Sequence, residues 1–270
     1  MIHNIFDISA VRRYVKKIGH GRNQFIDGVN SWKEASQHCS GYDADSIMGK
    51  VLTSTLKVKQ GEAEFERDSV LFYVAEYNWP IIAGLFLVAS QTAGRLNVLD
   101  FGGALGSTYF QNRKIFKTLQ DVRWNIVEQA HYAEAGRTYI QDHVLKFYSS
   151  IDECLVENIP NVVLLSSVLQ YLEFPLEVVK KLSLTGVSTL IIDRTPFSKI
   201  AQDKLLIQRV PPSIYKASYP MWVFSESAFM NVINQDWRML GEITCPEGTV
   251  YSDSGFEFTF QGMLLQRRES

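Results

Sequence analysis

The sequence predicts an α/β fold in which helices cover both faces of a mostly parallel sheet. From Leu96 onward, short apolar runs alternate regularly with helical segments, as they do in βαβ units. The runs at 161–167 and 188–194 are continuously apolar, which is typical of strands buried on both faces. Ligands of such sheets bind outside the carboxyl ends of the strands, so we expect the functional residues there.

Seven strands are predicted after residue 95. They cover residues 97–101, 122–129, 144–149, 161–167, 188–194, 238–245 and 257–267. Helices are predicted between them at 107–120, 133–142, 150–157, 176–183 and 226–233. Ser107, Ser150 and Ser225 suit the N-cap positions of their helices, and Ser150 with Glu153 forms a capping box.

The residues before 95 are predicted to form helices and loops. Helices are expected around 32–38, at 44–56 and at 70–93, the last one interrupted or restarted near Pro80. Residues 1–24 combine apolar positions at helical spacing with Arg and Lys between them, which makes a basic amphipathic arm. Two interpretations of this arm stay open: a helix docked on its own domain, or peripheral contact with a membrane surface.

Composition excludes several function classes. The 270 residues carry a net charge of -2 and a pI of about 6.2, so we expect no nucleic-acid partner. Cys39, Cys154 and Cys245 are widely spaced, which favours reduced thiols over a disulfide framework or a metal site. No apolar run approaches the ~20 residues that span a bilayer. The predicted location is cytoplasmic, with the inner face of the membrane as the alternative that the arm leaves open.

The stretch NVLDFGGALGSTYF places three glycines between a strand and a helix. Glycine permits a tight turn and lets backbone N–H groups approach a ligand. A phosphate-binding P-loop would require a lysine that is absent here, and the dinucleotide fingerprint would require glycines at the positions of Ala104 and Ser107. The pattern that remains is Asp100-x-Gly102-x-x-x-Gly106, with Gly103 in addition.

This pattern resembles the first motif of the class I S-adenosylmethionine-dependent methyltransferases, D/E-x-G-x-G-x-G, with Ala104 at the middle glycine. The resemblance implies a Rossmann-like sheet of seven strands, mostly parallel with the last strand antiparallel, and an N-terminal helical extension. It implies S-adenosyl-L-methionine (SAM) as cofactor. The loop backbone at Gly102, Gly103, Ala104 and Gly106 would lie against the methionine part, and Asp100 would face the amino group.

Further cofactor residues follow from the same resemblance. Glu128, at the end of the second strand, would accept hydrogen bonds from both ribose hydroxyls, and Gln129 follows it. Ser150 and Ile151 would hold the adenine, with Asp152 as a weaker candidate. Ser166, Ser167 and Gln170, in NVVLLSSVLQYL, would face the cofactor and acceptor side. Arg67, in a segment before the first strand, is the candidate for the cofactor carboxylate.

A longer set of segments is similar to one family of methyltransferases associated with bacterial surface-polysaccharide gene sets. They include KVKQGEAEFERDSVLF, EYNWP, LLSSVLQYLE, IIDRTPF and VPPSIYKASYPMW, and the likeness covers roughly residues 30–265. The family is itself named from its fold and cofactor motifs. Through its gene-set association, the resemblance implies a sugar, a glycan end or a related small molecule as acceptor, but it does not identify which one.

The predicted catalytic residues are Asp193, Arg194 and Tyr171. Asp193 ends the fifth strand, where a general base for an acceptor hydroxyl is expected; a structural Asp, salt-bridged or capping a helix, is the equal alternative. Arg194 would hold a phosphate or carboxylate of the acceptor. Tyr215, Tyr219 and Trp222, in the long connection that follows, are expected with Tyr171 in an acceptor cleft. His131 and His143 are interpreted as structural or solvated.

The leading function is therefore O-methylation of a sugar or surface-glycan-related acceptor by an S-adenosylmethionine-dependent enzyme without a metal. A non-catalytic cofactor-fold module in a polysaccharide assembly complex is the first alternative, and a nicotinamide-dependent oxidoreductase is the second. The chain is divided into a 1–24 arm, a 25–94 helical cap packed on the core and a 95–270 cofactor-binding domain. The sequence predicts no oligomeric state.

Overall fold

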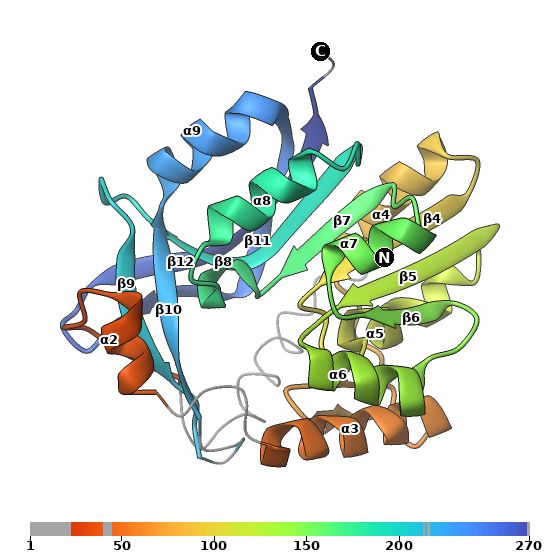
Figure 1. Ribbon diagram of the computed structural model, residues 1–270, viewed down its shortest axis with the longest axis horizontal. Coiled ribbons are helices and arrows are strands. Elements are labelled where there is room, and N and C mark those ends of the chain that lie inside the picture. Colours follow the sequence, from red (N-terminus) through yellow and green to blue (C-terminus); the bar gives the residue numbers. More distant parts are fainter. Residues whose placement is uncertain (1–22, 40–44, 213, 215–216, 269–270) are drawn as a thin grey trace, which may run out of the picture.

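Five parallel strands form the centre of the computed structural model, which describes residues 23–39, 45–212, 214 and 217–268 (Figure 1). They are β4 (Arg95–Phe101), β5 (Asp121–Val127), β6 (Leu145–Tyr148), β7 (Val162–Ser166) and β8 (Thr189–Ser198). Their order is β6-β5-β4-β7-β8, and all neighbours are parallel. The chain reverses its direction of travel across the sheet between β4 and β7, which is where open α/β sheets bind ligands.

Two further strands complete the predicted seven. β12 (Glu257–Arg267) pairs with β8 in the antiparallel direction, and β11 (Trp237–Tyr251) pairs antiparallel with β12. The last strand of the chain is thus inserted between β8 and β11. The predicted sheet of seven strands with an antiparallel last strand is confirmed for the described residues.

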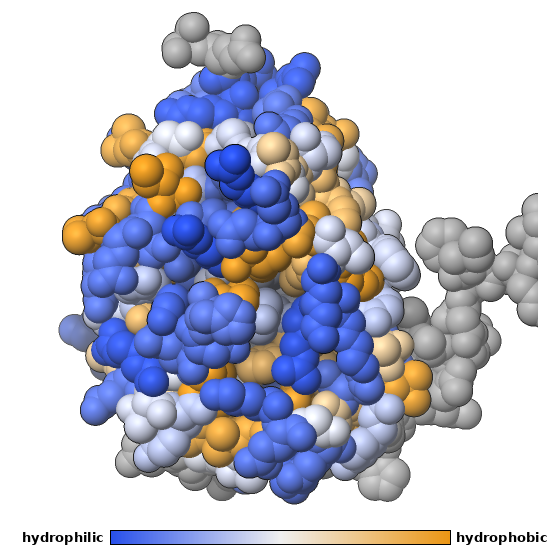
Figure 2. Space-filling view, turned by 90° about the vertical axis from the view of Figure 1, so that its right-hand side faces the viewer, coloured by the Kyte–Doolittle hydropathy of each residue, from blue (hydrophilic) through white to orange (hydrophobic). Residues whose placement is uncertain are grey.

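Helices cover both faces of the sheet. They include α4 (Trp79–Gln91), α5 (Ser107–Phe116), α6 (Ala130–Ala135) with the π-helical η1 (Gly136–Ile140), α7 (Ile151–Glu157), η2 (Leu169–Tyr171), α8 (Pro175–Ser183) and α9 (Glu226–Asp236). One core cluster packs residues of α4, α5 and α6 against the sheet, and a second packs residues of α7, α8 and α9. The face on the right of Figure 1 is mainly hydrophilic with small apolar patches, as solvent-facing helix surfaces require (Figure 2).

A ribbon of three strands that the sequence analysis missed extends the sheet beyond β8. It consists of β1 (Gln24–Ile26), β9 (Lys204–Arg209) and β10 (Ser218–Ser225), in the order β1-β9-β10. The helix α2 (Trp32–Gln37) packs on it, with the rings of Trp32 and Trp222 stacked at 6.0 Å. The connection after the fifth strand is therefore mostly strand, although it was expected as a long loop with Trp222 in an acceptor cleft.

The N-terminal segment also differs from its prediction. α3 (Asp45–Gln60) is helical as expected, but β2 (Phe65–Arg67) and β3 (Val70–Phe72) form a hairpin where part of a helix over 70–93 was predicted. Asp68 and Ser69 have φ angles of 51° and 64°, which close a two-residue turn and prevent helix formation there. Phe65 and Phe72 stack across the hairpin at 4.5 Å. α4 then starts at Trp79.

Several earlier predictions stay predictions. Residues 1–22 of the arm lie outside the described residues, and Gln24, its last residue, begins β1. The fold does not test the predicted domain boundaries at residues 24 and 94. The helices α3 and α4 contribute to the same core cluster as the sheet. Among the helices of the described residues, none has the length and apolar character needed to cross a membrane.

Candidate active site

A cleft of about 1630 Å³ opens at the carboxyl ends of the parallel strands. Its walls also include the β2–β3 hairpin, the β9–β10 ribbon and a segment of β11. Of the predicted site residues, the following line it: Arg67, Asp100, Gly102, Gly103, Ala104, Glu128, Gln129, Ser150, Ile151, Ser166, Ser167, Tyr171, Asp193 and Arg194. The topology thus brings residues from five strand ends and one hairpin to one surface.

The glycine loop leaves β4 in a conformation that side chains would obstruct. Gly102 has a φ of 74°, and a Cβ there would lie 2.4 Å from Val168. A Cβ on Gly103 would lie 2.6 Å from the Asp100 carboxylate. Gly106, with a φ of 97°, is the N-cap of α5 and does not line the cleft, so the prediction of a binding role for Gly106 is not supported by its position. Ser107 was predicted as that cap.

Asp100 is held rigidly beneath this loop. Its Oδ2 accepts a hydrogen bond of 2.8 Å from the indole Nε1 of Trp124, which lies on the neighbouring strand β5. Burial raises the pKa of Asp100 to about 7, and the negative charge of Glu128 adds to this effect while the Trp124 hydrogen bond opposes it. Asp100 lies so close to Gly103 that only glycine fits there, and it also borders the cleft.

Glu128 lies at the end of β5 and faces the same loop. Its Oε1 accepts from the backbone N–H of Ala104 at 3.3 Å, and its Oε2 accepts from the N–H of Gln129 at 2.7 Å. Burial raises the pKa of Glu128, although these two backbone hydrogen bonds and the nearby His131 favour the charged form. A carboxylate offers about four lone-pair positions, so this group retains capacity for further donors.

The end of β6 leads into α7 through the predicted N-cap. Ser150 Oγ accepts from the Glu153 N–H at 3.1 Å, and Glu153 accepts in turn from the N–H of Ser149 at 2.7 Å. Ser150 and Ile151 consequently line the cleft next to the end of β6. Asp152, the weaker candidate, points elsewhere and pairs with Lys181 at 2.7 Å on the surface.

The ends of β7 and β8 are tied together by hydrogen bonds. Ser166 Oγ donates to Asp193 Oδ2 at 2.9 Å, and the Ser167 N–H donates to the Asp193 carbonyl at 2.9 Å. Cys245 Sγ donates to Asp193 Oδ1 at 3.5 Å. Asp193 is 1% exposed, and burial raises its pKa, against the opposing effects of the Arg194 charge and the Ser166 hydrogen bond.

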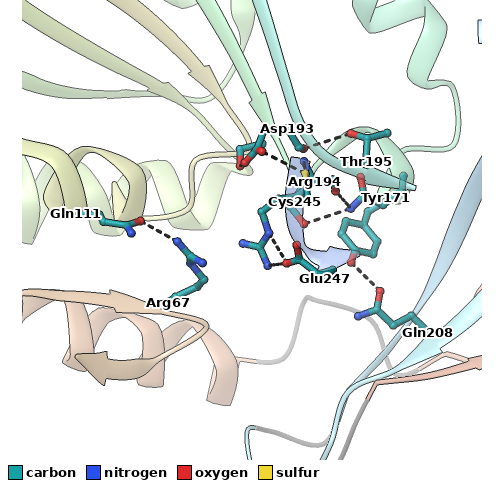
Figure 3. Close-up of polar contacts among 12 residues, drawn as sticks. Arg67, Gln111, Tyr171, Asp193, Arg194, Thr195, Gln208, Cys245 and Glu247 are labelled. Carbon is teal, nitrogen blue, oxygen red and sulfur yellow. Dashed lines mark hydrogen bonds and ion pairs between the residues drawn. The ribbon is translucent and has the colours of Figure 1, made fainter. Parts of the chain in front are cut away.

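Arg194 is engaged by an acid that the sequence analysis did not select. Its Nε and Nη2 donate to Oε1 of Glu247 at 2.7 and 2.6 Å (Figure 3). Burial disfavours ionisation of Glu247, but the charge and hydrogen bond of Arg194, a backbone hydrogen bond and the charge of Arg67 together hold the pKa of Glu247 below its ordinary value. Pro246 and Gly248 flank Glu247 directly after the predicted strand 238–245 and inside the observed β11, a combination that indicates a bulge and could have drawn attention to it.

Tyr171 connects the site to the extra ribbon. Its hydroxyl donates to Gln208 Oε1 on β9 at 2.7 Å (Figure 3). Its ring meets Tyr219 edge-on at 5.8 Å. Burial raises the pKa of Tyr171 to about 12, so this hydroxyl keeps its proton at neutral pH. Tyr219 lines the cleft as predicted, Trp222 does not, and Tyr215 lies outside the described residues.

The β2–β3 hairpin adds two acids that were not predicted. Glu66 is 1% exposed and accepts hydrogen bonds from Ser107 Oγ and from the Ser69 N–H. Burial raises the pKa of Glu66 to about 7, and the charge of Asp68 acts in the same direction. Arg67 donates through Nη2 to Gln111 on α5 at 2.8 Å. Only the fold brings this hairpin to the glycine loop.

The geometry divides the cleft into two halves. The half at the ends of β4, β5 and β6 combines a glycine loop, carboxylates and the apolar side chain of Ile151, and it suits a ligand with polar and flat apolar parts. The half at the ends of β7 and β8 combines Asp193, Arg194 and aromatic side chains. Among the described residues, no group of three His, Cys, Asp or Glu side chains is placed to hold a metal ion.

The chain matches no family model and no curated protein. Solved methyltransferase structures are similar to it over most of their length. The N-terminal domain of EvdMO1, determined with SAH and D-fucose, has a TM-score of 0.49 at 11% identity, covering 83% of this chain and 100% of that one. CalS10, an amino pentose methyltransferase from Micromonospora echinaspora, has a TM-score of 0.44 at 8% identity, covering 72% and 92%. The CcbJ methyltransferase from Streptomyces caelestis has a TM-score of 0.43 at 12% identity, covering 69% and 90%.

Proposed function

We propose that this protein is an S-adenosylmethionine-dependent methyltransferase that methylates a hydroxyl group of a sugar or surface-glycan-related acceptor. The observation that supports this most directly is the contact between Glu128 and the glycine loop. Binding of the cofactor requires a carboxylate for the ribose at one strand end and a loop that allows close backbone approach at the adjacent strand end. Here Glu128 accepts a hydrogen bond from the loop N–H of Ala104. Both border one large cleft at the switch point of the sheet.

The residues of the first half fit the parts of the cofactor. Glu128 would accept hydrogen bonds from the ribose cis-diol, and Ser150 and Ile151 would lie against the adenine. Arg67 would pair with the cofactor carboxylate, while the loop backbone and Asp100 would meet its methionine end. When bound, the cofactor supplies a methyl group on a positively charged sulfur, which is the electrophile of the reaction.

The residues of the second half would orient the acceptor and receive its proton. Asp193 lies on β8 in this half, and its raised pKa brings a carboxylate closer to the value that suits a general base. Tyr171 and Tyr219 would contact the acceptor ring through their aromatic faces. Enclosure by the β9–β10 ribbon would keep the acceptor aligned and exclude water, which supplies much of the rate in a displacement of this kind.

The glycan-related acceptor is supported by the sequence resemblance to methyltransferases associated with surface-polysaccharide gene sets. The aromatic and hydroxyl-bearing lining of the second half is compatible with it. The arm of residues 1–24 would allow contact with the membrane on which such glycans are assembled.

Isothermal titration with S-adenosylhomocysteine (SAH) tests the proposed cofactor, because SAH retains the ribose and methionine parts. The purified protein is expected to bind SAH in a saturable manner and to give no heat with NADH. The Gly102→Val variant, whose side chain would meet Val168, is expected to lose SAH binding. A folded protein that binds NADH and not SAH would overturn the proposal. Binding of SAH without turnover on any neutral glycoside would favour the non-catalytic module.

A further inference from the structure

Two strands, β8 and β11, are irregular at one level of the sheet, on either side of β12. β8 bulges at Asp193 and Arg194, which together face Gly262 on β12. β11 departs from its pairing with β12 between Thr244 and Thr249, where it carries three more residues than its partner. Bulges of this kind redirect side chains and are over-represented next to active sites.

The two bulges bring one ion pair to the wall of the cleft. Arg194 has a φ of 52°, a strained value for a residue with a side chain. Glu247 lies in the β11 bulge, directly before Gly248, whose φ is 59°. The side chains of Arg194 and Glu247 are 20% and 23% exposed, so the pair is partly buried and yet borders the cleft. The backbone of two strands is thus distorted at the place where this pair forms.

The pairing determines what Arg194 can offer to a ligand. Its Nε and Nη2 both donate to Glu247, and a guanidinium has five N–H donors in total. An anionic acceptor would have to displace Glu247, which would leave a partly buried carboxylate without its counter-ion. An uncharged hydroxyl-bearing acceptor does not compete with Glu247 for the positive charge of Arg194, so the pair stays intact.

We propose that Glu247 is a specificity-determining residue that neutralises Arg194 and makes the acceptor half of the cleft select uncharged hydroxyl-bearing acceptors over phosphorylated or carboxylated ones. This assignment rests on the proposed function for the identity of the acceptor half. It replaces the sequence-based expectation that Arg194 binds a phosphate or carboxylate. Rejection of the wrong ligand by an unfavourable charge is a common basis of specificity.

The test uses inorganic phosphate as an anionic probe, titrated calorimetrically at constant ionic strength into the full-length protein. Glu247→Gln keeps the side-chain shape and removes the counter-charge, so this variant is expected to bind phosphate at least ~10-fold more tightly than the wild type. Adding Arg194→Gln to it should abolish the gain. Glu242→Gln is the matched control, because Glu242 is exposed on the same strand and its loss changes the net charge equally.

Equal phosphate affinity in the wild type and in folded Glu247→Gln would overturn the proposal, as would a gain that survives Arg194→Gln or appears equally in Glu242→Gln. If Glu247→Gln does not fold, the wild type and Arg194→Gln decide the matter: phosphate binding by the wild type that depends on Arg194 contradicts the proposal, and its absence supports it. SAH titration of the same samples is independent. If the protein does not bind SAH, the proposed function is wrong. The phosphate result then still shows whether Glu247 neutralises Arg194.

Discussion

The carboxylate of Glu128 accepts a hydrogen bond from the backbone N–H of Ala104 at 3.3 Å. This contact joins the end of β5 to the loop that follows β4, and it is possible because parallel neighbours end at the same edge of the sheet. One oxygen is bonded to the loop and the other to Gln129, so a ligand bound at Glu128 also lies beside the glycine loop.

Glu128→Ala is expected to weaken SAH binding by about 1.5–3 kcal/mol, or roughly 10- to 100-fold, because hydrogen bonds to a charged acceptor are lost. Isothermal titration measures this change. Glu134→Ala removes an exposed acid of α6 and serves as the control with unchanged affinity. If both variants bind SAH like the wild type, the ribose role of Glu128 is wrong.

Gly103→Ala is expected to reduce both SAH affinity and the free energy of unfolding. The added methyl group would lie 2.6 Å from the Asp100 carboxylate, so Asp100 must move and its hydrogen bond with Trp124 must weaken. We expect a loss of about 1–3 kcal/mol in urea unfolding, as for other overpacked sites. Gly49→Ala in α3, where a Cβ meets no atom within 4 Å, should instead be neutral or stabilising. Equal stability of the two variants would contradict this account of the loop.

Asp193→Asn is expected to lower turnover by about 10²–10⁴ with SAH affinity unchanged, if Asp193 is the general base. Turnover is measured as SAH release from SAM with a panel of neutral methyl glycosides. Loss of folding or of SAH binding in this variant would instead identify Asp193 as structural.

Ser166→Ala provides a separate readout for the same base. Only ionised Asp193 can accept a proton, so wild-type turnover should fall as pH is lowered through its raised pKa. The Ser166 hydrogen bond lowers that pKa, so its removal should move the acidic limb of the pH profile to higher pH. If the acidic limb does not move, the group that titrates in the pH profile is not Asp193.

Glu66→Gln is expected to change the pH dependence of stability. Because burial raises the pKa of Glu66 from 4.5 to about 7, the folded state retains a proton that the unfolded state releases. The free energy of unfolding of the wild type should therefore fall as pH rises from about 4.5 through about 7. The variant lacks this contribution, so it should gain about 1–3 kcal/mol relative to the wild type between pH 5 and pH 8.

Urea unfolding at the two pH values measures this difference. Asp100, whose pKa is raised in the same direction, is present in both proteins and does not contribute to the comparison. Glu62→Gln removes an exposed acid close to the hairpin and should show no such pH dependence. A difference between Glu66→Gln and wild type that is the same at both pH values would contradict the assigned burial effect.

The sequence alone determined the central sheet and the proximity of the glycine loop and Glu128 in the half of the cleft proposed for the cofactor. Continuous apolar runs such as 161–167 and the capping box at Ser150 are local signals, because burial on both faces and helix capping each depend on neighbouring residues. The glycine loop and Glu128 each follow a predicted strand, and parallel strands necessarily bring their ends together. The order of these features along the chain was therefore enough to predict their proximity.

Only the tertiary structure decided the hairpin and the acceptor half. Glu66 reaches Ser107 across 41 residues, and Glu247 reaches Arg194 across 53. Glu66 has no local pattern that distinguishes it from a solvated surface charge. The residues that flank Glu247 indicate a bulge, but they do not identify its partner, which is distant in sequence. The pairing of β1 with β9 was missed for the same reason, because it joins Gln24 to Arg209. Burial and backbone distortion, which turn these residues into site components, arise only when the chain is folded.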